Sequence, residues 1–428
     1  MLRSVYTAFL YVFAPLALAG TALRGVRDPA YRDRLPERLG FTQVLQRSAA
    51  RPIWVHAVSV GEVQAAAPLV RVLLKKYPRH PLLVTTATPT GAQRVRALFS
   101  DSVRHAYFPY DLPGAVRRFL DRVHPAVAIV MEREIWPNLF DACHRRSIPV
   151  LLASARISER SAVRHQRFAS LFREALAGDV MVAAQTPQDA QRYGSIGARD
   201  VEITGNVKFD IEAPAEAMRA GESLRAAQFA QRLVWVAGST HEGEEDQVLA
   251  AHRRVMAQRP DALLILVPRH PNRFDAVRSW LREQQVTFVA RSRGEPVTST
   301  TSVLLADTLG ELMMFYAAAD IAFVGGSLIA SVGGHNLLEP AVLERPVLVG
   351  PNNFNAPEIA QLMLENGAAR QVNSAEQLAA AILELAMDPA MRARMGAQGR
   401  EMVAANRGAL DRVVQLVEAR LQVSSNTA

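Results

Sequence analysis

The sequence predicts an α/β fold of two doubly wound halves, preceded by a separate N-terminal helix. Short apolar runs alternate with segments of helical spacing, which is typical of a parallel sheet covered on both faces. This alternation pauses once, near residues 210–230, and then resumes. An uncharged stretch at residues 4–23 stands apart from both series. Because 428 residues are too many for one ordinary core, two domains are expected.

The composition excludes several classes of protein. An apolar fraction of 49% with 21% charged residues rules out wholesale disorder. The single cysteine, Cys143, rules out a disulfide framework and a cysteine-based zinc site. The net charge of +8 indicates an anionic partner, which is a nucleic acid, a phosphorylated substrate or an anionic membrane.

The N-terminal stretch is predicted to be a membrane-anchor helix over residues 1–24. Its twenty uncharged residues, 4–23, reach about 30 Å as a helix, the thickness of a hydrocarbon core. Arginines crowd behind it, which favours a cytoplasmic location for the rest of the chain. Polar residues and Pro15 weaken the span, so the helix could instead lie in the interface. A cleaved signal peptide and a soluble helix are the alternatives.

The first half is predicted to be a Rossmann-like domain over residues 25–212. Segments 61–76 and 112–123 have helical spacing. The buried strands are expected at 53–59, 82–88, 127–132, 149–154, 180–185 and 201–205.

The second half is predicted to follow a polar, alanine-rich linker at 213–230 and to occupy residues 231–423. It closes with helices over 375–423. Its strands are expected at 233–239, 262–269, 286–291, 301–307, 321–326 and 346–350. In such sheets ligands bind at the carboxyl ends of the strands, so the loops after these segments are where we expect the site.

Three charged residues follow predicted strands of the first half. Glu62 lies just after the tight turn Ser59-Val60-Gly61 and is a candidate general base, or simply a helix N-terminal carboxylate. Glu132 ends a buried strand, where a carboxylate is either paired or part of a site. Lys208 could neutralise a phosphate or carboxylate, although a lone lysine is more often solvated.

The densest motif of the second half is VGGSLIASVGGHNLLEP at 324–340. Its glycine pairs allow backbone amides to approach an anion, and a helix is expected to start near Leu337 or Leu338. Glu339 would then reach ribose hydroxyls. Arg269, after another strand, could pair with a phosphate. Glu311 is a candidate helix-capping carboxylate. A plain glycine turn and a surface arginine are the structural alternatives.

A basic segment at 156–173 interleaves arginines, including Arg156 and Arg160, with phenylalanines. It could hold an anionic lipid headgroup or be a solvated helix face. No zincin, hydrolase-elbow or Walker motif occurs, and the ten histidines show no metal-ligand spacing. No basic stripe or known motif supports nucleic-acid binding.

Taken in order, several short segments resemble the lipid A-specific 3-deoxy-D-manno-octulosonic acid (Kdo) transferases, glycosyltransferase family 30. The matching segments are ERLG (37–40), HAVSVGE (56–62), MEREIWP (131–137), GNVKFD (205–210), AGSTHEGEE (237–245), VPRHPNRF (267–274) and GGHNLLEP (333–340). One departure is Ser154, where the family pattern leads us to expect Asn.

The resemblance implies a GT-B fold and an inverting transfer of Kdo from CMP-Kdo to a lipid A precursor (lipid IVA) in lipopolysaccharide biosynthesis. No metal or other cofactor and no nucleic-acid partner is implied, and the location would be the cytoplasmic side of the bacterial inner membrane. Glu62 matches the general base, and Glu132 and Lys208 match transition-state stabilisers. Arg156 and Arg160, from the basic segment rather than from the resemblance, are the candidate acceptor-binding residues. The CMP-Kdo contacts would be Pro268, Arg269, His270, Gly310, Glu311, Leu312, Gly334, His335, Asn336, Leu337, Leu338 and Glu339.

Two other classes of function remain open from the sequence. One is another GT-B nucleotide-sugar enzyme, either a transferase with a different donor or an epimerase. The other is a catalytically inactive, membrane-tethered lipid-binding protein.

Overall fold

The computed structural model describes residues 2–43 and 50–426, and the chain divides into two compact units. Unit 1 contains Met1–Asp210 and Asn406–Ala428, and unit 2 contains Ile211–Ala405. Each unit holds one parallel sheet, as the alternation of apolar runs and helices predicts.

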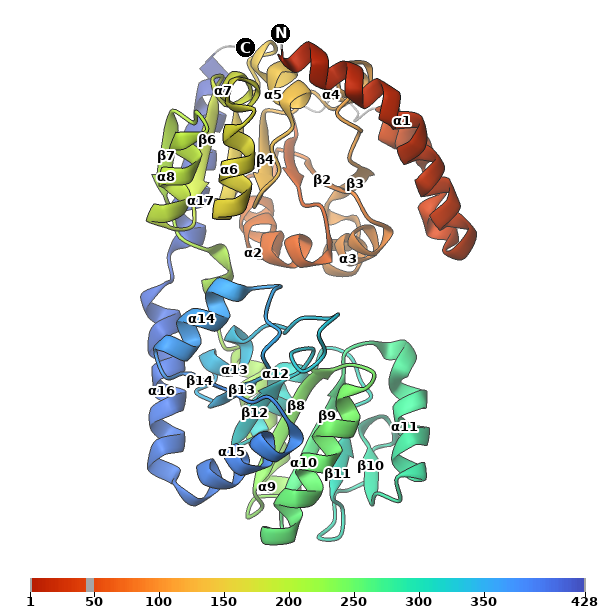
Figure 1. Ribbon diagram of the computed structural model, residues 1–428, viewed down its shortest axis with the longest axis vertical. Coiled ribbons are helices and arrows are strands. Elements are labelled where there is room, and N and C mark those ends of the chain that lie inside the picture. The colour runs from red at the N-terminus through yellow and green to blue at the C-terminus, as the bar shows by residue number, and fades with distance from the viewer. Residues whose placement is uncertain (1, 44–49, 427–428) are drawn as a thin grey trace. The chain divides into compact units, whose positions relative to one another are not determined.

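The sheet of unit 1 has seven strands in the order β3-β2-β1-β4-β5-β6-β7, all parallel (Figure 1). The order reverses direction beside β1, as in doubly wound folds. The strands are β1 (Ile53–His56), β2 (Leu82–Thr86), β3 (Arg104–Tyr107), β4 (Val127–Met131), β5 (Val150–Ala155), β6 (Val180–Ala184) and β7 (Asp200–Ile203).

Helices cover both faces of this sheet and give it two cores. Ile53 and Val55 of β1 point into one core, whereas Trp54 points into the other. The helices are α1 (Leu2–Arg27), α2 (Val60–Lys76), α3 (Pro89–Phe99), α4 (Pro113–Val123), α5 (Pro137–His144), α6 (Glu159–Gln166), α7 (Ala169–Leu176), α8 (Pro187–Ser195) and α17 (Ala409–Asn426). Short 3-10 turns are η1 (Pro29–Tyr31), η2 (Leu35–Leu39), η3 (Ser100–Ser102) and η4 (Val207–Phe209).

Local sequence signals mark the positions at which these helices begin. Thr88 and Thr186 precede α3 and α8, and each side chain accepts a hydrogen bond from a backbone N–H of the first turn. Each of these helices then begins with proline, whose missing N–H has no helical partner to lose. These helices therefore begin directly after the strands that precede them in the chain, and the carboxyl ends of the strands lie at one edge of the sheet.

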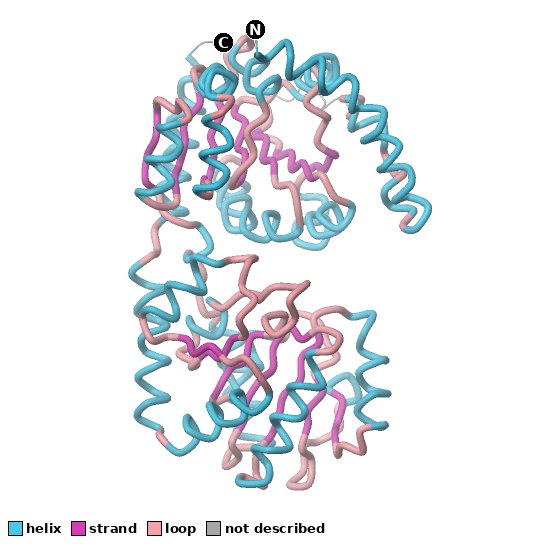
Figure 2. Tube along the Cα trace, in the orientation of Figure 1, coloured by secondary structure: helices cyan, strands magenta, loops and turns pink. Residues whose placement is uncertain are grey.

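Unit 2 has a second parallel sheet of seven strands, in the order β10-β11-β9-β8-β12-β13-β14. Figure 2 shows helices on both faces of its strands. The strands are β8 (Val234–Thr240), β9 (Leu263–Pro268), β10 (Phe288–Ala290), β11 (Val303–Leu305), β12 (Ile321–Val324), β13 (Val347–Val349) and β14 (Ala369–Gln371). The helices are α9 (Ala215–Gln228), α10 (Glu244–Gln258), α11 (Phe274–Glu283), α12 (Leu312–Ala318), α13 (Leu338–Val342), α14 (Pro357–Glu365), α15 (Ala375–Met387) and α16 (Pro389–Ala405), with 3-10 turns η5 (Pro271–Arg273) and η6 (Arg291–Arg293).

Every predicted strand is present, but the sequence pattern missed β3 and β14. Both are edge strands, which need less apolar sequence because one side has no neighbour. The first two residues of β3, Arg104 and His105, are polar and not fully buried. β14 is only three residues long.

The unit boundaries differ from the predicted domain boundaries in two places. The segment predicted as the linker 213–230 forms α9, whose buried Gly221 lies against α12 of unit 2. The final helix, α17, belongs to unit 1 rather than to the second half. Its residues Val413 and Val417 are fully buried in the core that contains Ile53. Asp210 holds the start of this segment through the N–H groups of Gly408 and Leu410, at 2.6 and 2.7 Å.

Candidate functional site

The carboxyl ends of β1, β4 and β5, with the turn after β7, bring four charged residues of unit 1 to one edge of its sheet. Glu62 lies in the first turn of α2, Glu132 follows β4, Arg156 follows β5 and Lys208 lies in η4. The sequence therefore placed Glu62, Glu132 and Lys208 at the correct ends of the correct strands, whereas it assigned Arg156 only to the basic segment 156–173.

Glu62 is half-buried and held in one orientation. Its Oε2 atom accepts a hydrogen bond from the backbone N–H of Val58 at 2.6 Å. Within the described residues its Oε1 atom has no hydrogen bond. Burial raises the pKa of Glu62 to about 7, opposed by the Val58 hydrogen bond and reinforced by the negative charge of Glu132. A carboxylate with this pKa can take up a proton near neutral pH, as a general base must.

Glu132 is almost fully buried and has two cationic partners. Lys208 Nζ lies 2.8 Å from its Oε1 atom, and Arg156 Nε lies 3.1 Å from its Oε2 atom. Burial by itself would raise the pKa of Glu132, but Lys208 and Arg156 bring it below the ordinary value. The backbone of Glu132 is left-handed, with φ of 57°, which is costly for a residue that is not glycine. This strain is consistent with a functional constraint on where its carboxylate points.

The two predicted acceptor-side arginines occupy different surroundings. Arg156 is bound to Glu132, whereas Arg160 is exposed in the first turn of α6. Ser154, which departs from the family pattern, is buried in β5 with φ of 52°. Its Oγ atom accepts a hydrogen bond from Gln185 Nε2 at 3.2 Å. Asn tolerates such a left-handed backbone better than Ser does, which gives a physical reason for the expected Asn.

In unit 2, the loop after β9 carries the first predicted donor residues. Pro268 is the buried last residue of β9. Arg269 and His270 are exposed beyond it, and the Arg269 backbone N–H donates to the Thr240 carbonyl oxygen at 3.0 Å. The guanidinium of Arg269 is therefore available to solvent beside a fixed backbone.

The loop after β11 contains Gly310, Glu311 and Leu312. Glu311 is the N-cap residue of α12, but its side chain makes no capping hydrogen bond. It pairs instead with Arg291 at 2.8 Å and accepts a hydrogen bond from Thr308. Arg291 is the main reason that the pKa of Glu311 is lowered. The carboxylate is thus ionised and fixed in position.

The loop before α13 carries the remaining predicted residues. Gly334 N–H donates to the Asn352 carbonyl oxygen at 2.7 Å, and Leu337 and Leu338 are buried. Asn336 is exposed and its amide donates to Glu339 at 3.2 Å. The helix begins at Leu338, as predicted, but is only five residues long, so its dipole is small.

The sequence suggested that backbone amides at the first glycine pair approach an anion of the ligand. In the structure, a buried carboxylate already accepts hydrogen bonds from amides at this turn. Glu244 accepts hydrogen bonds from Gly326 N–H at 2.7 Å and from Leu328 N–H at 3.0 Å. A Cβ atom at Gly325 would lie 2.8 Å from the same carboxylate. These amides are therefore committed to a protein anion. The sequence pattern missed Glu244, which could have been found from its place just after β8, the strand beside β12.

Three histidines gather at the loops after β8, β9 and β12. His241 Nε2 lies 2.8 Å from His335 Nε2 with the rings nearly parallel, and the His270 ring stands edge-on to His241 at 5.2 Å. Burial, and then the charge of Arg269, lowers the pKa of His335 to about 3. His335 and His270 were predicted, whereas His241 was not singled out. Among the described residues, no group of three His, Cys, Asp or Glu side chains is arranged to hold a metal ion.

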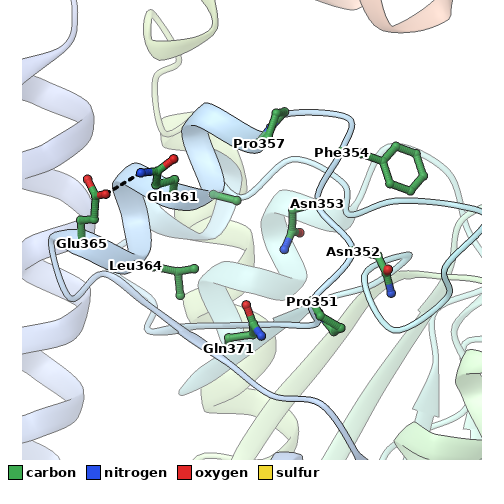
Figure 3. Close-up of a pocket in the computed structure, with 10 residues that line it drawn as sticks. Pro351, Asn352, Asn353, Phe354, Pro357, Gln361, Leu364, Glu365 and Gln371 are labelled. Carbon is green, nitrogen blue, oxygen red and sulfur yellow. Dashed lines mark hydrogen bonds between the residues drawn. The ribbon is translucent and has the colours of Figure 1, made fainter. Parts of the chain in front are cut away.

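Unit 2 also has an open depression of about 460 Å³ (Figure 3). It is lined by residues of the loop after β13 and by α14, among them Asn352, Asn353 and Phe354. Asn355, in the same loop, donates to the carbonyl oxygens of Val332 and Gly334. The depression therefore borders the candidate donor residues without containing them.

Comparisons with known proteins match both units. The family described as 3-deoxy-D-manno-octulosonic-acid transferase (kdotransferase) matches residues 33–211, and glycosyl transferases group 1 matches residues 239–402. The chain is 42% identical over 425 residues to a 3-deoxy-D-manno-octulosonic acid transferase of Haemophilus influenzae, covering 99% of each chain. It is 39% identical to one of Bordetella pertussis, covering 97% of this chain and 99% of the relative.

The fold also matches a solved structure with little sequence similarity. A UDP-GlcNAc 2-epimerase from Neisseria meningitidis aligns with a TM-score of 0.57 at 15% identity, over 86% of this chain and all of that one. At this identity the likeness concerns the fold alone. With the two parallel sheets, it confirms the predicted GT-B class.

Proposed function

We propose a specific reaction for this chain, which belongs to the 3-deoxy-D-manno-octulosonic acid (Kdo) transferase family. The donor is CMP-Kdo, the acceptor is the lipid A precursor lipid IVA, and the anomeric configuration is inverted. The proposal rests on the arrangement at the sheet edge of unit 1. There Glu62 has a pKa of about 7 and is influenced by the charge of Glu132, which forms an ion pair with Lys208.

Glu62 acts as the general base. The acceptor hydroxyl oxygen attacks the anomeric carbon of Kdo while the bond from that carbon to the phosphate oxygen breaks. CMP leaves with the bonding electrons, and the hydroxyl proton passes to the Glu62 carboxylate. The Val58 hydrogen bond supports this role because it fixes one carboxylate oxygen and leaves the other for the proton.

Glu132 and Lys208 stabilise the transition state. In the transition state the transferred sugar gains positive charge and the departing phosphate gains negative charge. A carboxylate and an ammonium group held in fixed positions can stabilise these two charges. The burial of Glu132 supports this role, because its interactions are stronger in a dry site. Arg156 positions Glu132, while Arg160 is available to a phosphate of the acceptor.

The donor is bound by unit 2. Arg269 and His270 pair with the anionic groups of CMP-Kdo, which carries a phosphate and a carboxylate. The backbone at Gly310, Glu311 and Leu312 and the loop from Gly334 to Glu339 hold the nucleotide, with Glu339 on the ribose hydroxyls. The fixed positions of these loops support this role, since hydrogen bonds tie each of them to a strand end or a neighbouring loop.

The chain works at the cytoplasmic face of the inner membrane, attached through α1. The described residues contain one helix long and apolar enough to cross a membrane, Leu2–Val26, by length and composition. The net charge of +8 supports attraction to an anionic leaflet and to a phosphorylated lipid.

The experiment that tests the reaction mixes purified full-length protein with freshly prepared CMP-Kdo and lipid IVA, in the presence of EDTA. We expect the mass of the lipid to increase by one or more Kdo units, with equimolar CMP release. CMP binding with no change in the lipid would point to another acceptor or to an inactive binder. Activity that disappears with EDTA and returns with a divalent cation would contradict the metal-independent mechanism.

A further inference from the structure

Helix α1 has two distinct faces. Residues of reduced exposure recur every three or four positions, which marks one side of a helix. These residues are Arg3, Tyr6, Thr7, Leu10, Ala14, Leu18, Thr21 and Gly25. These residues form the covered stripe of α1, which polar contacts attach to unit 1 at its beginning and near its end.

Polar contacts hold the beginning of this stripe on unit 1. Arg3 pairs with Asp141 of α5 and lies 3.3 Å from Glu174 of α7. The Tyr6 hydroxyl donates to Asp111 Oδ2 at 3.0 Å. The Thr7 hydroxyl donates to Asn138 Oδ1 at 3.0 Å. The contacts of these three residues thus fix the first two turns to α5, to α7 and to the loop that carries Asp111.

The buried carboxylate of Asp111 anchors this contact to the body of unit 1. It also accepts the N–H groups of Asn138 at 3.0 Å and Leu139 at 2.7 Å, at the start of α5. Near the other end of the helix, the Thr21 hydroxyl lies 3.2 Å from the Tyr110 hydroxyl. Tyr110 and Asp111 are adjacent in one loop, so this loop contacts α1 both near its beginning and near its end.

The opposite face of α1 is apolar and exposed. Its large side chains are Val5, Phe9, Val12, Leu16, Leu23 and Val26, with exposures of 55–69%. No charged residue interrupts positions 4–23. An apolar stripe of this length on the outside of a protein marks a partner surface. Exposed Arg24 and Arg32 beside its end favour an anionic partner.

We propose that α1 lies in the plane of an anionic bilayer surface, with its apolar stripe in the lipid and its covered stripe on unit 1, and does not cross the bilayer. In a spanning helix Arg3 and Thr21 would be separated by about 27 Å along the membrane normal. The contacts of Arg3 and Tyr6 would then have to break, or Asp141 and Asp111 would have to enter hydrocarbon, where charges are costly. An in-plane helix keeps every one of these contacts and still buries the apolar stripe.

The inference deepens the proposed membrane attachment and does not rest on the proposed reaction. A topology measurement therefore separates the two: the protein could be attached and active with α1 in either orientation. It could also be inactive on lipid IVA with α1 in the plane.

Site-specific labelling gives the first test, because the native Cys143 is buried in the folded protein. Full-length Ser4→Cys places a thiol at the start of α1, and Ser299→Cys places a control thiol in an exposed loop of unit 2. A membrane-impermeant maleimide is applied to spheroplasts, to inverted vesicles and to detergent extracts. We expect both variants to react in inverted vesicles and neither in spheroplasts. Reaction of the residue 4 thiol in spheroplasts alone, or only after detergent, would overturn the proposal.

Depth measurement gives the second test. Nitroxide labels at Val5→Cys, Val12→Cys and Val26→Cys, all on the exposed stripe, are compared in vesicles of phosphatidylethanolamine and phosphatidylglycerol. An in-plane helix gives one shallow depth for all three labels, and vesicles without phosphatidylglycerol bind more weakly. A label at residue 12 near the bilayer centre, with shallow labels at 5 and 26, would instead establish a spanning helix.

Discussion

Lys208 Nζ lies 2.8 Å from Glu132 Oε1, although 76 residues separate the two in the chain. The parallel sheet produces this contact, because Glu132 follows β4 and Lys208 follows β7 at the same edge. Arg156 completes a group of one buried carboxylate and two cations.

Lys208→Met is expected to destabilise unit 1 by about 1–3 kcal/mol at pH 7, because it leaves a buried carboxylate with one partner fewer. Urea denaturation measures this loss. Glu132→Gln in the Lys208→Met background should recover part of it, whereas the exposed Lys75→Met is a control with little effect. Equal losses for the two lysine variants would contradict the ion pair.

The stability lost in Lys208→Met should depend on pH. The pKa of Glu132 is lowered in the folded protein, so the ionised carboxylate adds stability above its ordinary pKa of 4.5. That stability disappears as the pH falls through the folded pKa. The difference between wild type and variant should therefore be largest near pH 7 and shrink below about pH 4.5.

Glu62→Gln is expected to lower kcat by about 100-fold or more while the dissociation constant of CMP changes less than about 2-fold. Glutamine keeps the shape and the hydrogen bond from Val58 but cannot take up a proton. Glu159→Gln, also in the first turn of a helix of unit 1, is the matched control. A parallel loss of melting temperature and CMP binding would instead indicate a structural carboxylate.

The pH profile of kcat/KM should show an acidic limb that reflects Glu62. A general base works in its ionised form, and burial raises the pKa of Glu62 to about 7. The rate should therefore fall about tenfold per unit below pH 7 and level off above it. Steady-state rates between pH 5 and 9 check this, and an acidic limb centred near pH 4.5 would contradict the raised pKa.

Arg269→Ala should raise KM for CMP-Kdo about tenfold or more, with a smaller change in kcat, because it removes a cation from the donor phosphate. Arg282→Ala, on the exposed side of α11, is the control for a general change of charge. Isothermal titration with CMP distinguishes the two variants. Unchanged CMP affinity in Arg269→Ala would remove this residue from the donor site.

Glu244→Gln should destabilise unit 2 by about 1–3 kcal/mol and weaken donor binding, because one of its oxygens becomes an amide that cannot accept a backbone N–H. Hydrogen exchange at Gly326 and Leu328 should accelerate specifically. The exposed neighbour Glu242→Gln is the control. Unchanged exchange at both amides would show that Glu244 does not hold the loop.

The sequence alone determined the two parallel sheets and the edge at which their charged residues lie. Apolar runs with helical spacers specify parallel strands, and in such sheets Glu62, Glu132, Lys208 and Arg269 necessarily fall at carboxyl ends. The sequence pattern did not predict the edge strands β3 and β14, because a strand that pairs on one side only does not require a continuous apolar run.

Only the tertiary structure decided which partner each of these charges has. No local pattern indicates that Arg156 shares Glu132 with Lys208, that Glu244 occupies the amides of the first glycine pair, or that α17 returns to unit 1. Nor does the apolarity of α1 reveal that its other face is tied to Asp111 and Asn138. Periodicity and turn signals are local in the chain, whereas burial and charge pairing depend on residues brought together from distant positions.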